Sequence, residues 1–97
     1  MEKENKIQLT ASLLKSIGHP IRIKIIIYLS QYQHVTVTKI SNDLSVQQPI
    51  MSLHLSVLRK QKVIMVKKDG KKSLYSISDI SAKQIVNIIY NTREKPN

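Results

Sequence analysis

The chain has 97 residues, which is room for a single domain spanning 1–97. Sixteen lysines and arginines against six acidic residues give a formal net charge of +10, and this balance indicates a polyanionic partner. There is no cysteine, so we exclude disulfides and thiolate metal sites. No apolar run approaches the roughly 20 residues of a membrane helix, and no signal-peptide core is visible. We therefore exclude membrane spans and expect a soluble, cytoplasmic protein.

Helical spacing is clear in the first predicted element and ambiguous in the second. Residues 5–17 place apolar side chains in two parallel rows, Ile7, Ala11 and Leu14 in one and Leu9, Leu13 and Ile17 in the other. The break at 18–20 ends this helix. From Ile21 to Ile25 the apolar residues alternate as in a strand, whereas Pro20 suits the first turn of a helix, so local propensity leaves both interpretations open.

The middle of the chain predicts two helices joined by a tight turn. Thr36 is the expected N-cap of a short helix over 36–44. A turn follows, and a longer helix over 47–61 must begin near Gln47, because Pro49 has no backbone N–H and fits only in a first turn. This order is typical of a helix-turn-helix unit.

The last third predicts a β-hairpin and one more helix. Residues 63–77 form the hairpin, whose arms carry Val, Ile, Leu and Tyr and whose turn is marked by Asp69-Gly70. The final helix covers 79–92. The predicted fold is therefore mostly α with a small β-hairpin, in the order α-α-α-α-β-β-α of a winged helix-turn-helix.

Three blocks resemble, in order and spacing, the arsenic-repressor-type (ArsR/SmtB) family of bacterial transcription regulators. Residues 14–25 (LKSIGHPIRIKI) are similar to the family's opening motif, 48–59 (QPIMSLHLSVLR) to its recognition helix and 68–77 (KDGKKSLYSI) to its wing. The resemblance spans about residues 13–78. It implies that 21–31 is a helix, that 47–61 reads DNA and that the protein acts as a dimer.

The sequence departs from the family pattern at three points. Lys62-Val63 replaces the usual Gly-Leu pair after the recognition helix, so we expect its exit to lack the left-handed residue. Gln47 replaces the family's N-cap serine and is a poorer cap. The short helix has no metal-sensing cysteine, and the last helix lacks the family's other metal ligands. We therefore expect no metal site and no cofactor, and the effector stays open.

Helical geometry assigns a DNA-reading face to residues 47–61. With Met51 at the centre of the buried face, Ser52 and Leu53 point outward. Amide and hydroxyl groups can pair with base edges, and apolar side chains can touch a thymine methyl; the absence of arginine from the first two turns disfavours a guanine-dominated code. His54 lies about 60° from the buried centre, and we expect it to bridge the core and the DNA backbone.

The hairpin tip is the most basic part of the chain. Four lysines, at 67, 68, 71 and 72, surround one acid, Asp69, and duplex phosphates would neutralise them. An all-lysine tip predicts backbone contact with little base information. The complete predicted DNA-binding set is Thr36, Thr38, Lys39, Gln47, Gln48, Pro49, Ile50, Ser52, Leu53, His54, Ser56, Arg59, Lys60, Lys67, Lys68, Lys71 and Lys72.

The first and last helices, 5–17 and 79–92, have apolar faces too wide for so small a core. A two-fold dimer interface is predicted there, although both helices could instead cap one monomer core. The predicted interface residues are Ile7, Leu14, Ile85, Ile88 and Ile89.

The predicted function is a homodimeric, sequence-specific regulator of transcription that binds a near-palindromic operator in double-stranded DNA, with repression as its outcome and without metal sensing. Two alternatives stay open: a basic RNA-binding module and a protein-interaction winged helix. The four aromatic residues are scattered tyrosines, which disfavours an RNA-stacking platform. No catalytic constellation is visible, so we do not expect an enzyme.

Overall fold

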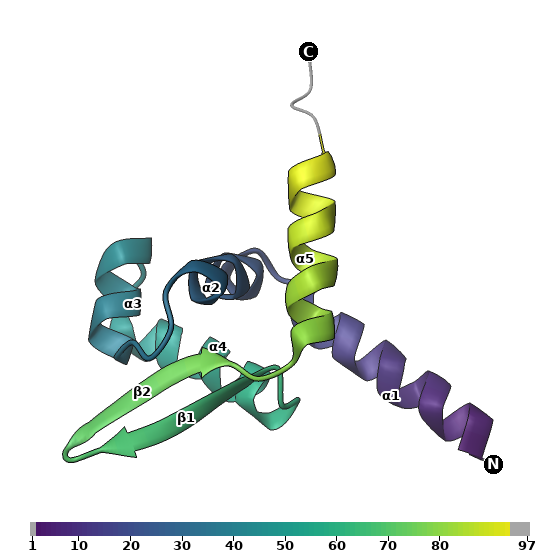
Figure 1. Cartoon of the computed structure of the whole chain (residues 1–97), viewed down its shortest axis with the longest axis horizontal. Helices are drawn as coiled ribbons and strands as arrows, with labels where there is room; N and C mark the ends of the chain where they lie inside the picture. Colours follow the sequence, from purple (N-terminus) through teal and green to yellow (C-terminus); the bar gives the residue numbers. More distant parts are fainter. Residues whose placement is uncertain (1, 94–97) are drawn as a thin grey trace.

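The computed structural model describes residues 2–93. Along the chain these form α1 (Glu2–Ile17), α2 (Pro20–Gln31), α3 (Val37–Leu44), α4 (Gln48–Lys60), β1 (Ile64–Asp69), β2 (Lys72–Ile77) and α5 (Ile80–Thr92), as Figure 1 shows. The predicted fold class is confirmed. The predicted and observed bounds differ by one residue, except that α1 begins three residues earlier than expected.

The ambiguous segment after residue 20 is helical. His19 is its N-cap, and the His19 Nδ1 atom accepts a hydrogen bond of 3.1 Å from the Ile21 backbone N–H. Ile25, Ile26 and Leu29 are all fully buried, which is the i, i+1, i+4 spacing of a helix and not the alternation of a strand. Ile21 and Ile25 share one face of the helix, whereas Ile23 lies about 200° from Ile21 and is also partly buried, so both sides of α2 carry isoleucine.

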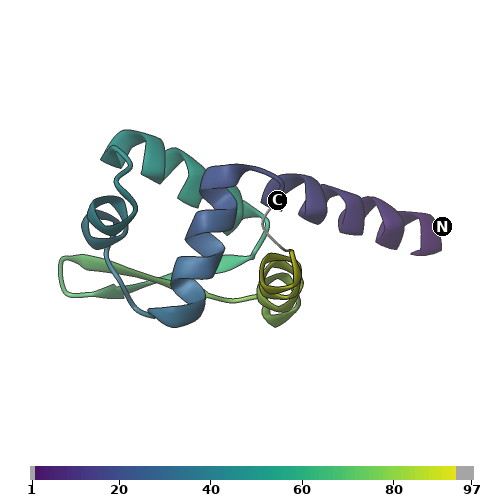
Figure 2. The same ribbon diagram turned by 90° about the horizontal axis from the view of Figure 1, so that it is seen from above.

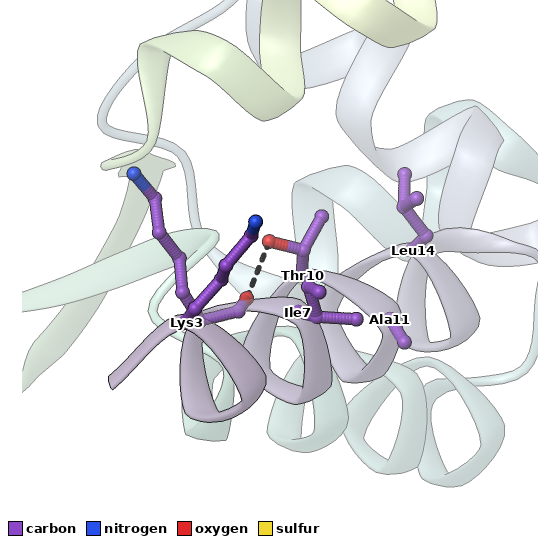
Figure 3. A pocket seen from close by; sticks show the side chains of 6 residues that line it. Lys3, Ile7, Thr10, Ala11 and Leu14 are labelled. Atoms are coloured by element: carbon purple, nitrogen blue, oxygen red, sulfur yellow. Dashed lines mark hydrogen bonds between the residues drawn. The ribbon is translucent and has the colours of Figure 1, made fainter. Parts of the chain in front are cut away.

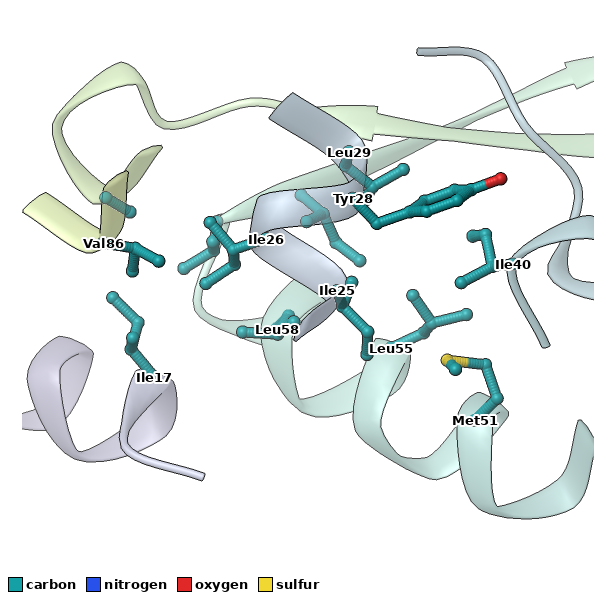
Figure 4. Packing of buried hydrophobic residues seen from close by; sticks show 13 residues of the cluster. Ile17, Ile25, Ile26, Tyr28, Leu29, Ile40, Met51, Leu55, Leu58 and Val86 are labelled. Carbon is teal, nitrogen blue, oxygen red and sulfur yellow. The ribbon is translucent and has the colours of Figure 1, made fainter. Parts of the chain in front are cut away.

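α2 is the centre of the hydrophobic core. Its buried face packs against α4 and receives one side chain each from α1 and α3 and two from α5, and Figure 4 shows the elements converging on one cluster. The cluster includes Ile17, Ile25, Ile26, Tyr28, Leu29, Ile40, Met51, Leu55, Leu58 and Val86. Because α4 turns Met51, Leu55 and Leu58 inward, its opposite face is left free.

The hairpin is a regular antiparallel pair with a third attachment that the sequence did not predict. Its register pairs Asp69 with Lys72 at the tip, and Gly70 takes the left-handed φ of 62° in the turn. Val35, in the loop before α3, exchanges two backbone hydrogen bonds with Tyr75, of 3.1 and 2.8 Å. This bridge ties the outer edge of β2 to the helix-turn-helix and holds the wing in place.

The two ends of the molecule carry different elements. Figure 2 shows α3, the N-terminal end of α4 and the hairpin tip at one end, with α1 extending away at the other. Only the last turn of α1 reaches the core, where Ser16 and Ile17 are buried. The remaining length of α1 is exposed to solvent, except for the half-buried Leu13.

The exit of α4 corrects one prediction. A left-handed residue is present there, and it is Lys62, with a φ of 60°. Its backbone N–H donates to the Arg59 carbonyl at 2.9 Å and the Val63 N–H donates to the Leu58 carbonyl at 3.0 Å, which closes the helix end. The turn geometry is thus kept without glycine, at the expense of Cβ strain.

Lys62→Gly is expected to raise the free energy of unfolding by about 1 kcal/mol, because glycine adopts this φ without Cβ strain. Lys62→Ala is the matched control, since it removes the same charge and keeps the Cβ atom. Chemical denaturation of the three proteins measures the difference. Equal stabilities for the glycine and alanine variants would contradict this explanation.

Candidate nucleic-acid interface

The helix-turn-helix is held by local hydrogen bonds. The Thr36 hydroxyl accepts from the Lys39 backbone N–H at 3.2 Å, which confirms Thr36 as the N-cap of α3. Ser45 ends α3 with a left-handed φ of 56°, and the Val46 N–H donates to the Ser41 carbonyl at 3.0 Å. These contacts fix the direction in which α4 leaves the turn.

α4 begins without a side-chain cap. Gln47 occupies the N-cap position and makes no capping hydrogen bond, as its residue type predicted. The first N–H groups of a helix have no partner inside the helix, and they carry the positive end of its dipole. The start of α4 can therefore accept a negatively charged group such as a phosphate.

The two faces of α4 are sharply divided. Met51, Leu55 and Leu58 are at most 1% exposed, whereas Ile50 is 43% and Leu53 is 64% exposed. The predicted outward residues Gln47, Gln48, Pro49, Ser52 and Ser56 are exposed as well. The division of α4 into a core face and a free face is confirmed, and contact of that free face with DNA stays a prediction.

α3 adds polar groups beside this free face. The Thr38 hydroxyl donates to Gln48 Oε1 over 3.4 Å, a long hydrogen bond that links the starts of α3 and α4. Lys39 is paired with Asp43, with 3.1 Å between Nζ and Oδ2. Thr36, Thr38 and Lys39 are thus brought next to α4, but Lys39 already has a carboxylate partner within the chain.

Asp43 also receives a hydrogen bond from the Tyr28 hydroxyl. The Tyr28 bond, aided by Lys39, lowers the pKa of the Asp43 carboxyl below its ordinary value. Burial, reinforced by the bond to Asp43, raises the pKa of Tyr28 to about 12. This pair joins α2 to α3 and holds the first helix of the helix-turn-helix against the core.

The wing lysines are exposed and close to the hairpin tip. The strands reach the tip of the hairpin, so Lys67 and Lys68 lie on β1 and Lys72 begins β2, while Lys71 shares the turn with Gly70. Their positions on paired strands restrict the backbone and spread the charges on both sides of a narrow ribbon.

Arg59 and Lys60 lie at the far end of α4. Both are exposed, but they follow Gln48 by 11 and 12 positions, a separation of about 17 Å along the helix axis. The structure therefore does not bring them to the start of α4, and any contact they make would be with a flanking part of the duplex.

His54 is more buried than predicted. Its side chain is 7% exposed, and its Nδ1 atom accepts a hydrogen bond of 3.1 Å from Arg22 Nε. The side chain is enclosed at the junction of α1, α2 and α4, and its contact with the DNA backbone stays a prediction. Burial, together with His19 and Arg22, lowers the pKa of His54.

Arg22 is a structural residue that lies within the opening motif of residues 14–25, although the motif assigned it no role. Besides His54, it donates from Nη1 to the Ser16 carbonyl at 3.1 Å, and the His19 ring lies 4.5 Å from the His54 ring, centroid to centroid. One guanidinium thus connects the end of α1 to the recognition helix. A contact between residues 32 positions apart leaves no local trace in a sequence.

The buried contact between His54 and Arg22 predicts a loss of stability in mild acid. Since the pKa of His54 is lower in the folded than in the unfolded chain, the unfolded state takes up the proton first as the pH falls. The stabilisation is complete above the ordinary histidine pKa of 6.5 and is lost as the pH drops below it.

Thermal unfolding between pH 7.5 and 5.5 should therefore show a smaller decrease in Tm for His54→Gln than for the parent protein. Glutamine can still accept from Arg22 but does not titrate. His34→Gln is the control, because His34 is exposed and should leave the pH dependence unchanged. Identical pH dependence for His54→Gln and the parent would contradict the assignment.

Comparison with known proteins identifies the family. The model of the bacterial regulatory proteins of the arsR family matches residues 19–65. An uncharacterized HTH-type transcriptional regulator of Methanocaldococcus jannaschii is 33% identical over 92% of this chain and 97% of that protein. This chain belongs to the arsR family.

Named relatives and solved structures agree with this membership. The transcriptional repressor PagR of Bacillus anthracis is 33% identical over 81% of this chain and 79% of that protein. Its crystal structure superposes with a TM-score of 0.82, at 29% identity, covering 89% and 98% of the two chains. The repressor BigR from Xylella fastidiosa gives 0.84 at 25% identity, covering 98% and 96%. The arsR-family chain described here is a transcriptional regulator with a winged helix-turn-helix DNA-binding fold.

This arsR-family chain has no cysteine, so it lacks the metal-sensing cysteine motif of the family that it resembles. Within residues 2–93, no three His, Asp or Glu side chains lie close enough together to hold a metal ion. The same residues include no helix that is both long and apolar enough to cross a bilayer.

Proposed function

We propose that this protein is a transcriptional repressor that binds a near-palindromic site in double-stranded DNA as a homodimer, without metal sensing and without enzymatic activity. The observation that carries the proposal is the free face of α4 next to the lysine-tipped wing, at one end of the molecule (Figure 2). A helix of this size fits the major groove, and a basic hairpin beside it suits the flanking phosphates. The repressors among the relatives support repression as the outcome.

The apolar face of α1 supports a dimer. Figure 3 shows Ile7, Ala11 and Leu14 along one side of the helix, with the Thr10 hydroxyl donating to the Lys6 carbonyl at 2.8 Å. That bond occupies the hydroxyl proton, so the floor of the groove is apolar, and Lys3 and Lys6 line one end of it. A 16-residue helix with so little packing is only marginally stable in water, which favours a partner that covers it.

α5 continues this apolar surface. A second groove, between α1 and α5, is lined by Leu14, Ile17, Ile85 and Ile89. Leu14 contributes to both grooves, so they form one continuous face, and Ile88 is 62% exposed on the same helix. A second copy is an occupant that would bury the face symmetrically.

Dimerisation through the face formed by α1 and α5 explains why the two ends of the protomer differ. It leaves α3, the start of α4 and the wing of each protomer free at the opposite ends. Two recognition helices about 34 Å apart would enter successive major grooves on one side of the duplex, which requires an operator with two-fold symmetry.

The proposal is tested by footprinting the protein on genomic DNA, together with competition between duplex DNA and single-stranded RNA. We expect protected, two-fold symmetric sites that overlap promoters, and displacement by duplex but not by RNA. Preferential displacement by RNA would favour the RNA-binding alternative. A dimer that binds neither duplex DNA nor RNA, even in dilute buffer, would favour the protein-interaction alternative and overturn the proposal.

A further inference from the structure

We propose that Ile50 and Leu53 determine sequence specificity by contacting the 5-methyl groups of thymine, so that each half-site has A·T pairs where the first turns of α4 enter the groove. The inference rests on the proposed function and adds the base chemistry that the recognition helix selects.

Ile50 and Leu53 do not belong to the hydrophobic core. The core face of the same helix is occupied by Met51, Leu55 and Leu58, which are at most 1% exposed. Ile50 is 43% and Leu53 is 64% exposed, in the first two turns of α4. Being three positions apart, the two side chains are neighbours on the helix surface and form one apolar patch.

The chemistry of the major groove selects the partner of this patch. Thymine is the base that presents a methyl group there, while the other bases present polar donors and acceptors. An apolar side chain pressed against a polar edge would leave a base nitrogen or oxygen without a hydrogen-bond partner, which is unfavourable. The patch therefore favours thymine over cytosine and over the purines.

The neighbouring polar groups favour the same base pairs. Gln48 is exposed, and its amide can accept from adenine N6 and donate to adenine N7. No lysine or arginine occurs between residues 47 and 58, and Arg22 is engaged with His54 and the Ser16 carbonyl. A guanine would find no basic side chain for its O6 and N7 atoms at the start of the helix.

The position of the patch separates it from the proposed dimer surface. Figure 2 shows the start of α4 at the end of the molecule that carries the wing, opposite the exposed length of α1. A partner that extends across this end of the molecule (Figure 2) can cover the patch and also reach the four exposed lysines of the wing. A polyanion with methyl groups in a groove satisfies both requirements, and duplex DNA is such a partner.

The test begins with selection of binding sites from random duplexes by the full-length protein. Each thymine of the selected half-site is then replaced by uracil, which removes the methyl group and keeps the base pairing. We expect two positions per half-site at which uracil weakens binding by about four-fold, the effect of one buried methyl group.

Two protein variants assign these positions. Leu53→Ala should make one position insensitive to uracil and leave the other sensitive, and Ile50→Ala should do the reverse, so each variant controls for the other. Both side chains are exposed, so both variants should keep the parent's circular dichroism spectrum and Tm.

The outcomes separate this inference from the proposed function. Selection of G·C pairs at the positions covered by α4, or equal affinity for thymine and uracil duplexes, overturns the inference and leaves a DNA-binding regulator in place. Uracil sensitivity that both variants retain overturns the assignment to these two residues. Failure to select any duplex overturns the proposed function, and the inference with it.

Discussion

Ile89→Lys is expected to convert the proposed dimer into folded monomers and to weaken operator binding by a factor of about 100 or more. Ile89 is 50% exposed and lines the groove between α1 and α5. In a two-fold interface the substitution would bury two like charges without partners, which costs several kcal/mol. A monomer also loses the gain of linking two half-site contacts, which is on the order of 10² to 10⁴.

The substitution has the useful property that it adds positive charge. A lysine alone would strengthen binding to DNA, so a loss of affinity can only come from the lost assembly. Analytical ultracentrifugation gives the oligomeric state, and a gel-shift titration with the symmetric site gives the affinity.

Ile80→Lys is the matched control. Ile80 is 60% exposed at the start of the same helix, but it lines neither apolar groove. It should leave the dimer and its affinity for the operator intact. A dimeric Ile89→Lys protein with unchanged affinity would rule out the α1–α5 face as the interface.

The faces of single helices were predictable because each is set by a local period. Once Met51 is taken as the centre of the buried face, the 100° rotation per residue puts Leu55 and Leu58 beside it, and all three are in the core. The same rule left Ile21–Ile25 undecided, because Ile23 packs on the side of α2 opposite Ile21 and Ile25, and a helix covered on both sides shows a strand-like alternation over five residues.

What the sequence could not supply are contacts that tertiary packing creates. Arg22 meets His54 from another helix, and Val35 pairs with Tyr75 across 40 positions. Neither pair follows from a period, so the partner that His54 finds inside the protein could not be predicted. Lys62 shows a different limit: the turn geometry demanded a left-handed residue, and the chain meets that demand without the usual glycine.

The apolar residues on free surfaces carry different kinds of information. On α1 and α5 they form a continuous face too large for one small domain, and a second copy is the simplest cover. On α4 two of them stand among polar residues, at the end of the molecule that also carries the basic wing (Figure 2), and that setting favours a nucleic-acid groove. Exposure alone would not have separated these roles, and the end of the molecule at which each set of residues lies does (Figure 2).

Replacing Lys71 and Lys72 together by alanine is expected to weaken binding to every duplex alike. Both lysines are exposed at the tip of the wing, where they would neutralise phosphates. Loss of two contacts per protomer, or four per dimer, should make the slope of log K against log salt less steep by about 3 to 4. If the affinities converge near 1 M salt, the loss at 0.15 M is on the order of 10²- to 10³-fold.

The operator and a random duplex of equal length should be affected by the same factor, since phosphate contacts carry no sequence information. Lys15→Ala with Lys24→Ala is the matched control: it lowers the net charge of +10 by the same two units, at exposed positions on α1 and α2. If the control flattened the salt dependence as much as the wing variant, net charge alone would explain the effect. If the wing variant lost affinity for the operator and kept it for random DNA, the tip would be contacting bases. The assignment of base contacts to α4 and phosphate contacts to the wing would then be wrong.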